Sequence, residues 1–253
     1  MPTIKRRIAN FIEKVSGNFV ISPADMFTLP ERRHLARIFR HYGVDCVFDV
    51  GANDGQYATM LREAVGYRGH IISYEPIPEL AQRMARRPQE TNDTLWHVEA
   101  LALDHEAGPA TFHIAVSDQF SSLRAPAIDQ PKRFKHENAV AREVTVQRST
   151  IADELVKWQE KLGFGRPFLK MDTQGNDMAV VEGAGANLAA FVGLQTELAI
   201  QRLYEGAPDF VETLNVLRAK GFEPSAFVPS NDAHFPEMYE VDCILYNASM
   251  KPA

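Results

Sequence analysis

The chain has 253 residues, 45% of them apolar and 24% charged, which is typical of a globular protein with an ordinary hydrophobic core. Its net charge of −6 excludes the broad basic surface that general nucleic-acid binding requires, so we expect no nucleic-acid partner. No apolar run reaches the roughly eighteen residues of a membrane span. The two cysteines lie in separate apolar runs and indicate neither disulfides nor a zinc cluster, so we expect a cytoplasmic protein.

The first 43 residues are predicted to form a helical extension (1–43) ahead of one main domain (44–253). Apolar residues recur at helical spacing over 4–15, with basic residues on the opposite face. We expect this amphipathic helix to dock on the domain or on a partner subunit, as in a homodimer. A second helix is predicted over 30–42, where Gly43 ends it.

From residue 45 onward, apolar runs alternate with helical patterns. This alternation is typical of a mostly parallel sheet with crossover helices, so the predicted fold class is α/β and Rossmann-like. Seven core strands are predicted over 46–50, 70–74, 95–101, 167–172, 192–198, 225–228 and 239–246. Helices are predicted over 55–65, 78–87, 151–161, 178–190 and 208–220.

An insertion over 109–150 interrupts the alternation. Two β-like runs, 110–116 and 143–148, flank a polar segment, 117–141, that has neither helical nor strand periodicity. We predict an inserted hairpin with a long mobile connection. Long connections inside a compact domain are usually functional, so we expect this one to act as a lid over an acceptor.

A buried strand that ends in a glycine turn and opens a helix predicts a nucleotide-like cofactor site. The spacing Gly51-x-x-x-Gly55 differs from the Gly-x-Gly-x-x-Gly of dinucleotide enzymes, and Asp49 precedes the turn. Both features favour a cationic nucleoside without a pyrophosphate, such as S-adenosylmethionine. An acid at the end of an apolar strand also implies a cationic partner or several donors. The candidate cofactor residues here are Asp49, Gly51, Ala52, Asn53, Gly55, Gln56 and Tyr57.

Glu75 follows the second strand at the distance where an acid binds ribose hydroxyls in nucleotide-binding βαβ units. Its neighbour Pro76 belongs to the same candidate site, and an exposed turn acid before the proline is the alternative. After the third strand, position alone predicts that Glu99, Ala102 and Leu103 border the adenine.

Two carboxylates are predicted at the tips of neighbouring strands, Asp172 and Glu197. Parallel strands lie about 4.8 Å apart, so these side chains could converge and would then share a proton, a metal or a cation. A divalent metal and a general base are both open, as is structural pairing with Lys170 or Arg202. No Asn-Pro-Pro-aromatic sequence follows the fourth strand, which favours an oxygen over a nitrogen acceptor.

These residues resemble the FkbM-type methyltransferases, a family of class I S-adenosylmethionine-dependent enzymes. The resemblance implies a seven-stranded sheet with an antiparallel last strand, and O-methylation of sugars or secondary metabolites. The matching segments run from about Val47 to Tyr246 and are Phe48–Gly55, Tyr74–Pro76, Ala102–Leu103, Ser121–Leu123, Leu169–Gly175, Glu182–Ala184, Leu203–Gly206, Leu217–Arg218, Gly221–Phe222 and Val241–Asp242.

The sequence therefore predicts an S-adenosylmethionine-dependent O-methyltransferase acting on a small-molecule hydroxyl. Asp172 is the first candidate for the chemistry and Glu197 the second. An NAD-dependent oxidoreductase remains an alternative, although the third glycine of its fingerprint is missing. A non-catalytic binding module is the other alternative, and intact Asp49 and Glu75 argue against it.

Overall fold

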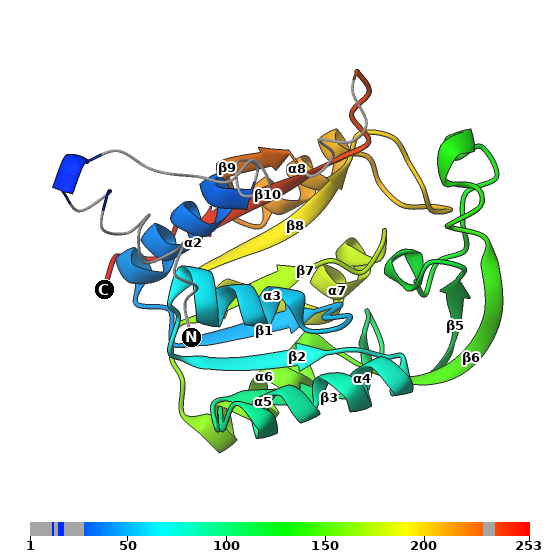
Figure 1. Cartoon of the computed structure of the whole chain (residues 1–253). Helices are drawn as coiled ribbons and strands as arrows, with labels where there is room; N and C mark the ends of the chain where they lie inside the picture. The colour runs from blue at the N-terminus through cyan, green and yellow to red at the C-terminus, as the bar shows by residue number, and fades with distance from the viewer. Residues whose placement is uncertain (1–11, 13–14, 18–27, 230–235) are drawn as a thin grey trace.

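The structure, a computed structural model, describes residues 12, 15–17, 28–229 and 236–253 (Figure 1). Residues 4–15, the predicted amphipathic helix and dimer contact, fall almost entirely outside this part of the chain. Among the described residues, no helix has both the length and the apolar character needed to cross a membrane.

A seven-stranded sheet forms the centre of the molecule, in the order β3-β2-β1-β7-β8-β10-β9. Only β10 runs against its neighbours, β8 and β9, so the predicted α/β class and the antiparallel last strand are confirmed. The strands are β1 (Cys46–Val50), β2 (His70–Tyr74), β3 (Trp96–Glu99), β7 (Pro167–Met171), β8 (Gly193–Ala199), β9 (Phe222–Pro229) and β10 (Glu240–Asn247).

Helices cover both faces of this sheet, which explains why its central strands β1 and β7 are buried along their whole length. Successive residues alternate between the faces: Phe48 packs in the core under α6, α7 and α8, whereas Val47 packs in the core under α2, α3 and α4. The helices are α2 (Thr28–Tyr42), α3 (Gln56–Met60), α4 (Pro78–Met84), α5 (Arg86–Glu90), α6 (Ile151–Leu162), α7 (Asp177–Ala184) and α8 (Phe210–Ala219).

Three predicted helices are less regular than their apolar periodicity indicates. The helix predicted over 55–65 changes after α3 into a π-helical turn, Leu61–Val65. The one predicted over 178–190 ends at Ala184 and continues as a 3-10 turn from Gly185, whose φ is 53°. The third is divided at Ala85 into α4 and α5.

The strand predicted over 95–101 is shorter than expected, because the chain leaves the main sheet after Glu99. The next residues form β4 (Ala102–Leu103), which joins a separate three-stranded sheet in the order β4-β6-β5. In this sheet β5 (Gly108–Ala115) and β6 (Val140–Ser149) pair antiparallel, as predicted for the inserted hairpin. Figure 1 shows the hairpin beyond the carboxyl ends of the parallel strands.

The polar segment between β5 and β6 is docked, although its sequence has no periodicity. It contains two 3-10 turns, Asp118–Phe120 and Lys132–Phe134. The side chain of Asn138 is fully buried and donates to the carbonyl of Leu203 at 3.3 Å. This connection therefore packs on the loop after β8, where we predicted a mobile segment.

Helix α2, from the predicted extension, contributes to the main core. Leu35 is fully buried and Phe39 nearly so, in the same cluster as Val47 and Phe168 of the sheet. The C-terminus lies beside α2, where the amide of Ala253 donates to the carbonyl of His41 at 3.0 Å. The described part of the extension is thus an integral layer of the domain.

If α2 is part of this core, Leu35→Ala should lower the free energy of unfolding by about 2–5 kcal/mol, because the cavity left behind cannot be refilled. Chemical denaturation followed by circular dichroism measures this. The exposed Arg37→Ala on the same helix is the control and should change stability by less than about 0.5 kcal/mol. Equal, small effects would mean that α2 is a dispensable appendage.

Candidate functional site

A cavity of about 530 Å³ opens at the carboxyl ends of the parallel strands, between the main sheet and the insertion. This is where open α/β sheets bind their ligands. The wall comes from the turn after β1, the ends of β2, β7, β8 and β10, and the insertion. The residues used below that line it are Glu31, Gly51, Ala52, Asn53, Gln56, Tyr57, Glu75, Pro76, Ala102, Leu103, Asp118, Phe120, Lys170, Asp172, Gln174, Gln195, Glu197, Glu240 and Asp242.

The turn after β1 depends on left-handed backbone at three positions, since φ is 73° at Gly51, 48° at Asn53 and 76° at Gly55. Gly51 also passes very close to β7: a Cβ there would lie 1.9 Å from the carbonyl oxygen of Asp172. Gly55 faces the core instead of the cavity, and a Cβ on it would meet Trp96 at 3.0 Å. The first glycine brings the turn against the neighbouring strand, and the second packs the start of α3.

Asp49 is fully buried and is not among the residues that line the cavity. Its Oδ1 lies 3.2 Å from the Nζ of Lys170, and its Oδ2 accepts from the hydroxyl of Ser73 at 2.9 Å. The cationic partner that the sequence required is therefore Lys170 of the protein itself. Asp49 therefore supports the turn after β1 through Lys170, whose Nζ also donates to the carbonyl of Gly51.

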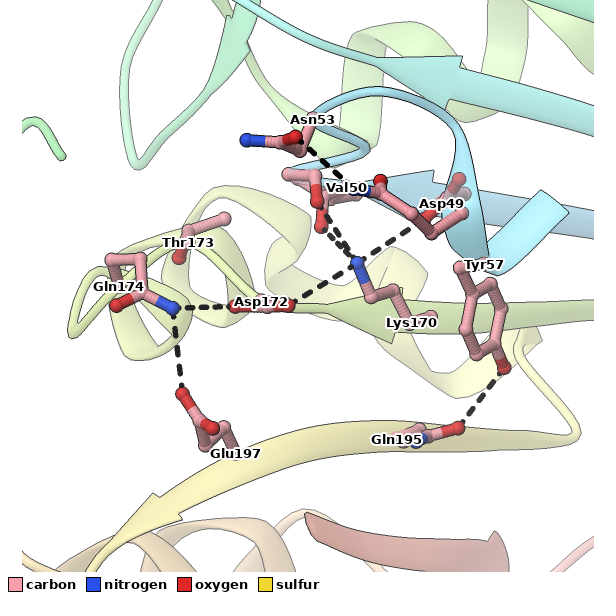
Figure 2. A network of polar contacts seen from close by, with 12 residues as sticks. Asp49, Val50, Asn53, Tyr57, Lys170, Asp172, Thr173, Gln174, Gln195 and Glu197 are labelled. Atoms are coloured by element: carbon pink, nitrogen blue, oxygen red, sulfur yellow. Dashed lines mark hydrogen bonds and ion pairs between the residues drawn. The ribbon is translucent and has the colours of Figure 1, made fainter. Parts of the chain in front are cut away.

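Lys170 joins the turn to β7 (Figure 2). Its Nζ donates to the carbonyl of Gly51 at 2.9 Å and lies 3.7 Å from Oδ2 of Asp172. Burial works against the charge of Lys170, but the carboxylates of Asp49 and Asp172 outweigh burial and raise its pKa above the ordinary value. Lys170 is consequently a stable cation at the edge of the cavity.

Glu75 lies at the end of β2, with only 4% of its surface exposed. Its two oxygens accept from the backbone amides of Asn53 and Ile77, both at 2.8 Å. Burial raises the pKa of Glu75 to about 7, although these two amides oppose the shift. The carboxylate thus faces the cavity, connects the two turns and changes charge near neutral pH.

The structure separates the residues predicted to border an adenine. Ala102 and Leu103 line the cavity together with Pro76, and they give it an apolar wall. Glu99 is not among the lining residues, and its carboxylate pairs with Lys157 at 3.0 Å. The side chain of Glu99 is therefore engaged by α6, because β3 ends before the cavity.

Asp172 and Glu197 converge as predicted, and the carboxamide of Gln174 lies between them (Figure 2). Its Nε2 donates to Oδ1 of Asp172 at 2.8 Å and lies 3.5 Å from Oε2 of Glu197. Burial and the charges of Glu240 and Asp172 raise the pKa of Glu197 well above its usual range. Of the structural pairings considered, Lys170 approaches Asp172, whereas Arg202 pairs with Asp209 and Glu212.

Four further carboxylates line the cavity, and the sequence did not single them out as site residues: Glu31, Asp118, Glu240 and Asp242. Asp242 stands opposite Glu197 in the antiparallel pair of β10 and β8. Burial and the charge of Glu31 raise the pKa of Asp242 to about 8, and burial and Asp172 raise that of Glu240 to about 7. The alternation of Glu240 and Asp242 along one strand is the signal that could have found them, because residues two apart share a face.

Glu31, Glu240 and Asp242 form what we call the acidic wall. Gln195 connects its Glu31 to the rest of the site. Its Nε2 donates to Glu31 of α2 at 2.8 Å, and its Oε1 accepts from the hydroxyl of Tyr57 at 3.0 Å (Figure 2). Among the described residues, no group of three or more His, Cys, Asp or Glu side chains is arranged to hold a metal ion. Asp172 and Glu197 share the side-chain amide of Gln174, and Asp49 and Asp172 share Lys170.

Residues 49–224 match the sequence pattern of the methyltransferase FkbM domain. The chain belongs to this family. The match covers the turn after β1, Glu75, the insertion, Asp172 and Glu197, and it leaves Glu31, Glu240 and Asp242 outside. The description of this family names a methyltransferase, which favours methyl transfer over the NAD-dependent oxidoreductase considered as an alternative.

Solved structures share the fold at low sequence identity. A methyltransferase FkbM from Methylobacillus flagellatus KT superimposes with a TM-score of 0.50 and 14% identity, over 82% of this chain and 44% of that one. A SAM-dependent methyltransferase from Aquifex aeolicus gives a TM-score of 0.41 and 12% identity, over 94% of this chain and 98% of that one. This chain thus matches less than half of the Methylobacillus chain. No curated protein matches the sequence.

The close approach of Gly51 to β7 generates a prediction. Gly51→Ala should destabilise the protein by about 3 kcal/mol or more beyond the cost of a left-handed alanine, because the new Cβ would collide with the carbonyl of Asp172. Gly66→Ala is the matched control, since Gly66 has a similar φ of 77° with open space around it. We expect this control to cost only about 1–2 kcal/mol. Equal losses in denaturant titrations would contradict the packing account.

Proposed function

We propose that the protein methylates a hydroxyl group of a small molecule with S-adenosylmethionine as the donor. The observation that carries this proposal is the shared cavity, which the turn after β1, Glu75, Asp172 and Glu197 all line. A cofactor held by the turn and Glu75 would therefore lie in the same cavity as an acceptor held near Asp172 and Glu197. The family supports the donor, and the carboxylates at the ends of β7 and β8 support the acceptor chemistry.

The described residues fit this donor. Glu75 can accept hydrogen bonds from the two ribose hydroxyls, and Ala102, Leu103 and Pro76 offer an apolar surface to the adenine. Asn53, Gln56 and Tyr57 line the neighbouring part of the cavity and can hold the methionine portion. When bound, S-adenosylmethionine supplies an electrophilic methyl group on a positively charged sulfur.

The acceptor side can orient a hydroxyl and take its proton. An acceptor oxygen held close to the methyl carbon needs little further help, because orientation alone removes much of the barrier. As the oxygen forms its new bond, its proton can pass to a carboxylate, and Asp172 is our first candidate, with Glu197 second. No Asn-Pro-Pro-aromatic sequence follows β7, which supports an oxygen acceptor such as a sugar or a secondary metabolite.

The acidic residues that line the cavity restrict the charge of the acceptor that it can bind. Seven of the described lining residues are carboxylic acids, and Lys170 is the one basic residue among them. Even at an effective dielectric constant near 20, two like charges about 4 Å apart repel by about 4 kcal/mol. The cavity therefore disfavours anionic acceptors increasingly as the pH rises through the pKa values of Glu75, Glu240 and Asp242, which are about 7, 7 and 8, because these acids then become ionised.

A non-catalytic module is the competing proposal, and binding decides between the two. Calorimetry with S-adenosylmethionine should give saturable binding. Incubation with a panel of sugars and phenols should release S-adenosylhomocysteine. A purified protein that binds neither S-adenosylmethionine nor S-adenosylhomocysteine would remove the enzyme proposal.

The ribose assignment predicts a pH dependence that can be measured with adenosine, which has no amino-acid portion. Ribose hydroxyls donate to the ionised carboxylate, and Glu75 has a pKa of about 7. The affinity for adenosine should therefore rise by up to about tenfold from pH 6 to pH 8. Glu75→Ala should abolish this rise and weaken binding of S-adenosylmethionine by about tenfold or more.

The control ligand for this measurement is 2′,3′-dideoxyadenosine, which lacks both hydroxyls and should bind equally at pH 6 and pH 8. A wild-type affinity for adenosine that stays constant across this window would contradict the ribose role of Glu75.

The acidic wall generates a second prediction about acceptors. In a panel of glycosides matched in size and assayed at about pH 9, where Glu240 and Asp242 are both largely ionised, neutral sugars and amino sugars should exceed uronic acids in kcat/KM by about tenfold or more. The double variant Glu240→Gln, Asp242→Asn should narrow this difference, because it removes two of the repelling charges. Release of S-adenosylhomocysteine is the measurement. A preference for uronic acids in the wild type would show that the wall does not face the acceptor.

A further inference from the structure

Gln174 occupies an unusual place in the cavity wall, two residues after Asp172. Its backbone φ of 56° is left-handed, which only a few per cent or so of non-glycine residues adopt. The next residue, Gly175, has a φ of 81°, and the ring of Tyr204 packs against it so closely that a Cβ would lie 2.8 Å from that ring. The loop is thus held in a strained form, with Tyr204 against it.

The carboxamide of Gln174 makes contacts at both ends. Its Nε2 faces Asp172 at 2.8 Å and Glu197 at 3.5 Å, as Figure 2 shows. Its Oε1 lies 2.7 Å from the hydroxyl of Tyr204. A carboxamide has two N–H donors on one atom, so it can serve two neighbouring carboxylates at once.

The hydrogen-bonding inventory fixes which way this amide points. An ionised carboxylate only accepts, so a flipped amide would place its oxygen 2.8 Å from Oδ1 of Asp172 and would be repelled. With Nε2 toward the carboxylates, Oε1 requires a donor, and the hydroxyl of Tyr204 supplies it. That hydroxyl also lies 3.0 Å from the carbonyl of Phe120, but its single hydrogen is committed to Gln174.

We propose that Gln174 is a positioning residue of the methyl-transfer site, whose amide is oriented by Tyr204 and holds the carboxylates of Asp172 and Glu197 in register. The amide takes the place between the two carboxylates that a shared proton or cation would otherwise occupy. This inference rests on the proposed function, in which one of these carboxylates receives the proton of the acceptor.

The insertion contributes to the same arrangement. The hydroxyl of Ser122 lies 2.7 Å from the carbonyl oxygen of Gln174 and 3.2 Å from that of Thr173, so it can donate to this loop. Ser122 itself is almost fully buried. The backbone of Gln174 is therefore held by the insertion, and its side chain is held by Tyr204.

Kinetics provide the first test, with the acceptor that the sugar and phenol panel identifies. Tyr204→Phe, which removes only the hydroxyl, and Gln174→Met, which removes the amide, should each lower kcat by about tenfold or more. Calorimetric affinity for S-adenosylmethionine should stay within about threefold of the wild type. The hydroxyl control is Tyr67→Phe, since Tyr67 donates to the carbonyl of His70 away from the cavity.

Gln174→Gly separates positioning from folding. Glycine relieves the left-handed backbone, so the melting temperature should stay within about 3 °C of the wild type while kcat falls as in Gln174→Met. If the melting temperature falls steeply along with kcat, Gln174 acts through folding alone. If Tyr204→Phe and Gln174→Met keep kcat within about twofold, the positioning role is wrong.

Nuclear magnetic resonance tests the bridge without any acceptor. The side-chain amide of Gln174, assigned by its loss in Gln174→Glu, should exchange its hydrogens at least about tenfold more slowly than that of the exposed Gln201. Tyr204→Phe should remove most of this protection. Exchange as fast as that of Gln201 in the wild type would overturn the bridge. Failure of the proposed function would appear separately, as absence of S-adenosylmethionine binding.

Discussion

A buried ion pair between Asp49 and Lys170 is the interaction on which the site depends. The two residues are register neighbours on β1 and β7, and they continue in a polar row with Ser73 on β2 and Gln195 on β8. Burying two charges is costly unless further hydrogen bonds satisfy them. Ser73 and the carbonyl of Gly51 do this, so the pair is compensated only while the turn after β1 keeps its shape.

The carboxylates around the cavity divide into two groups with different origins. Glu75, Asp118, Asp172 and Glu197 lie within the part of the chain that matches the family, and we propose that Glu75 binds the cofactor and that Asp172 or Glu197 accepts the proton. Glu31, Glu240 and Asp242 come from segments on either side of that match. The segments on either side of the family match thus supply three of the seven acids that line the cavity. Burial and the charges of neighbouring carboxylates raise the pKa values of Glu240 and Asp242, which expresses the cost of gathering like charges in a buried place.

The insertion contacts the loops that follow β7 and β8 of the main sheet. Ser122 and Phe120 of the insertion, Gln174 after β7 and Tyr204 after β8 contact one another through hydroxyls, carbonyls and one amide. A segment with no regular periodicity is therefore ordered by buried polar contacts rather than by a helix or strand. These contacts also hold the insertion against the wall of the cavity, because Phe120 and Gln174 line the cavity and Ser122 and Tyr204 bond to them.

Sequence alone determined the α/β class, the seven strands, the turn after β1 and the convergence of Asp172 and Glu197, since these depend on periodicity and on local backbone requirements such as the glycines at positive φ. It could not assign Asp49 to Lys170, place Glu99 beside Lys157, or bring Glu31 and Asp242 to the cavity. Those outcomes depend on which strands and helices become neighbours in space. Only the tertiary structure decides that, because the partners are up to about two hundred residues apart along the chain and no local pattern records their pairing.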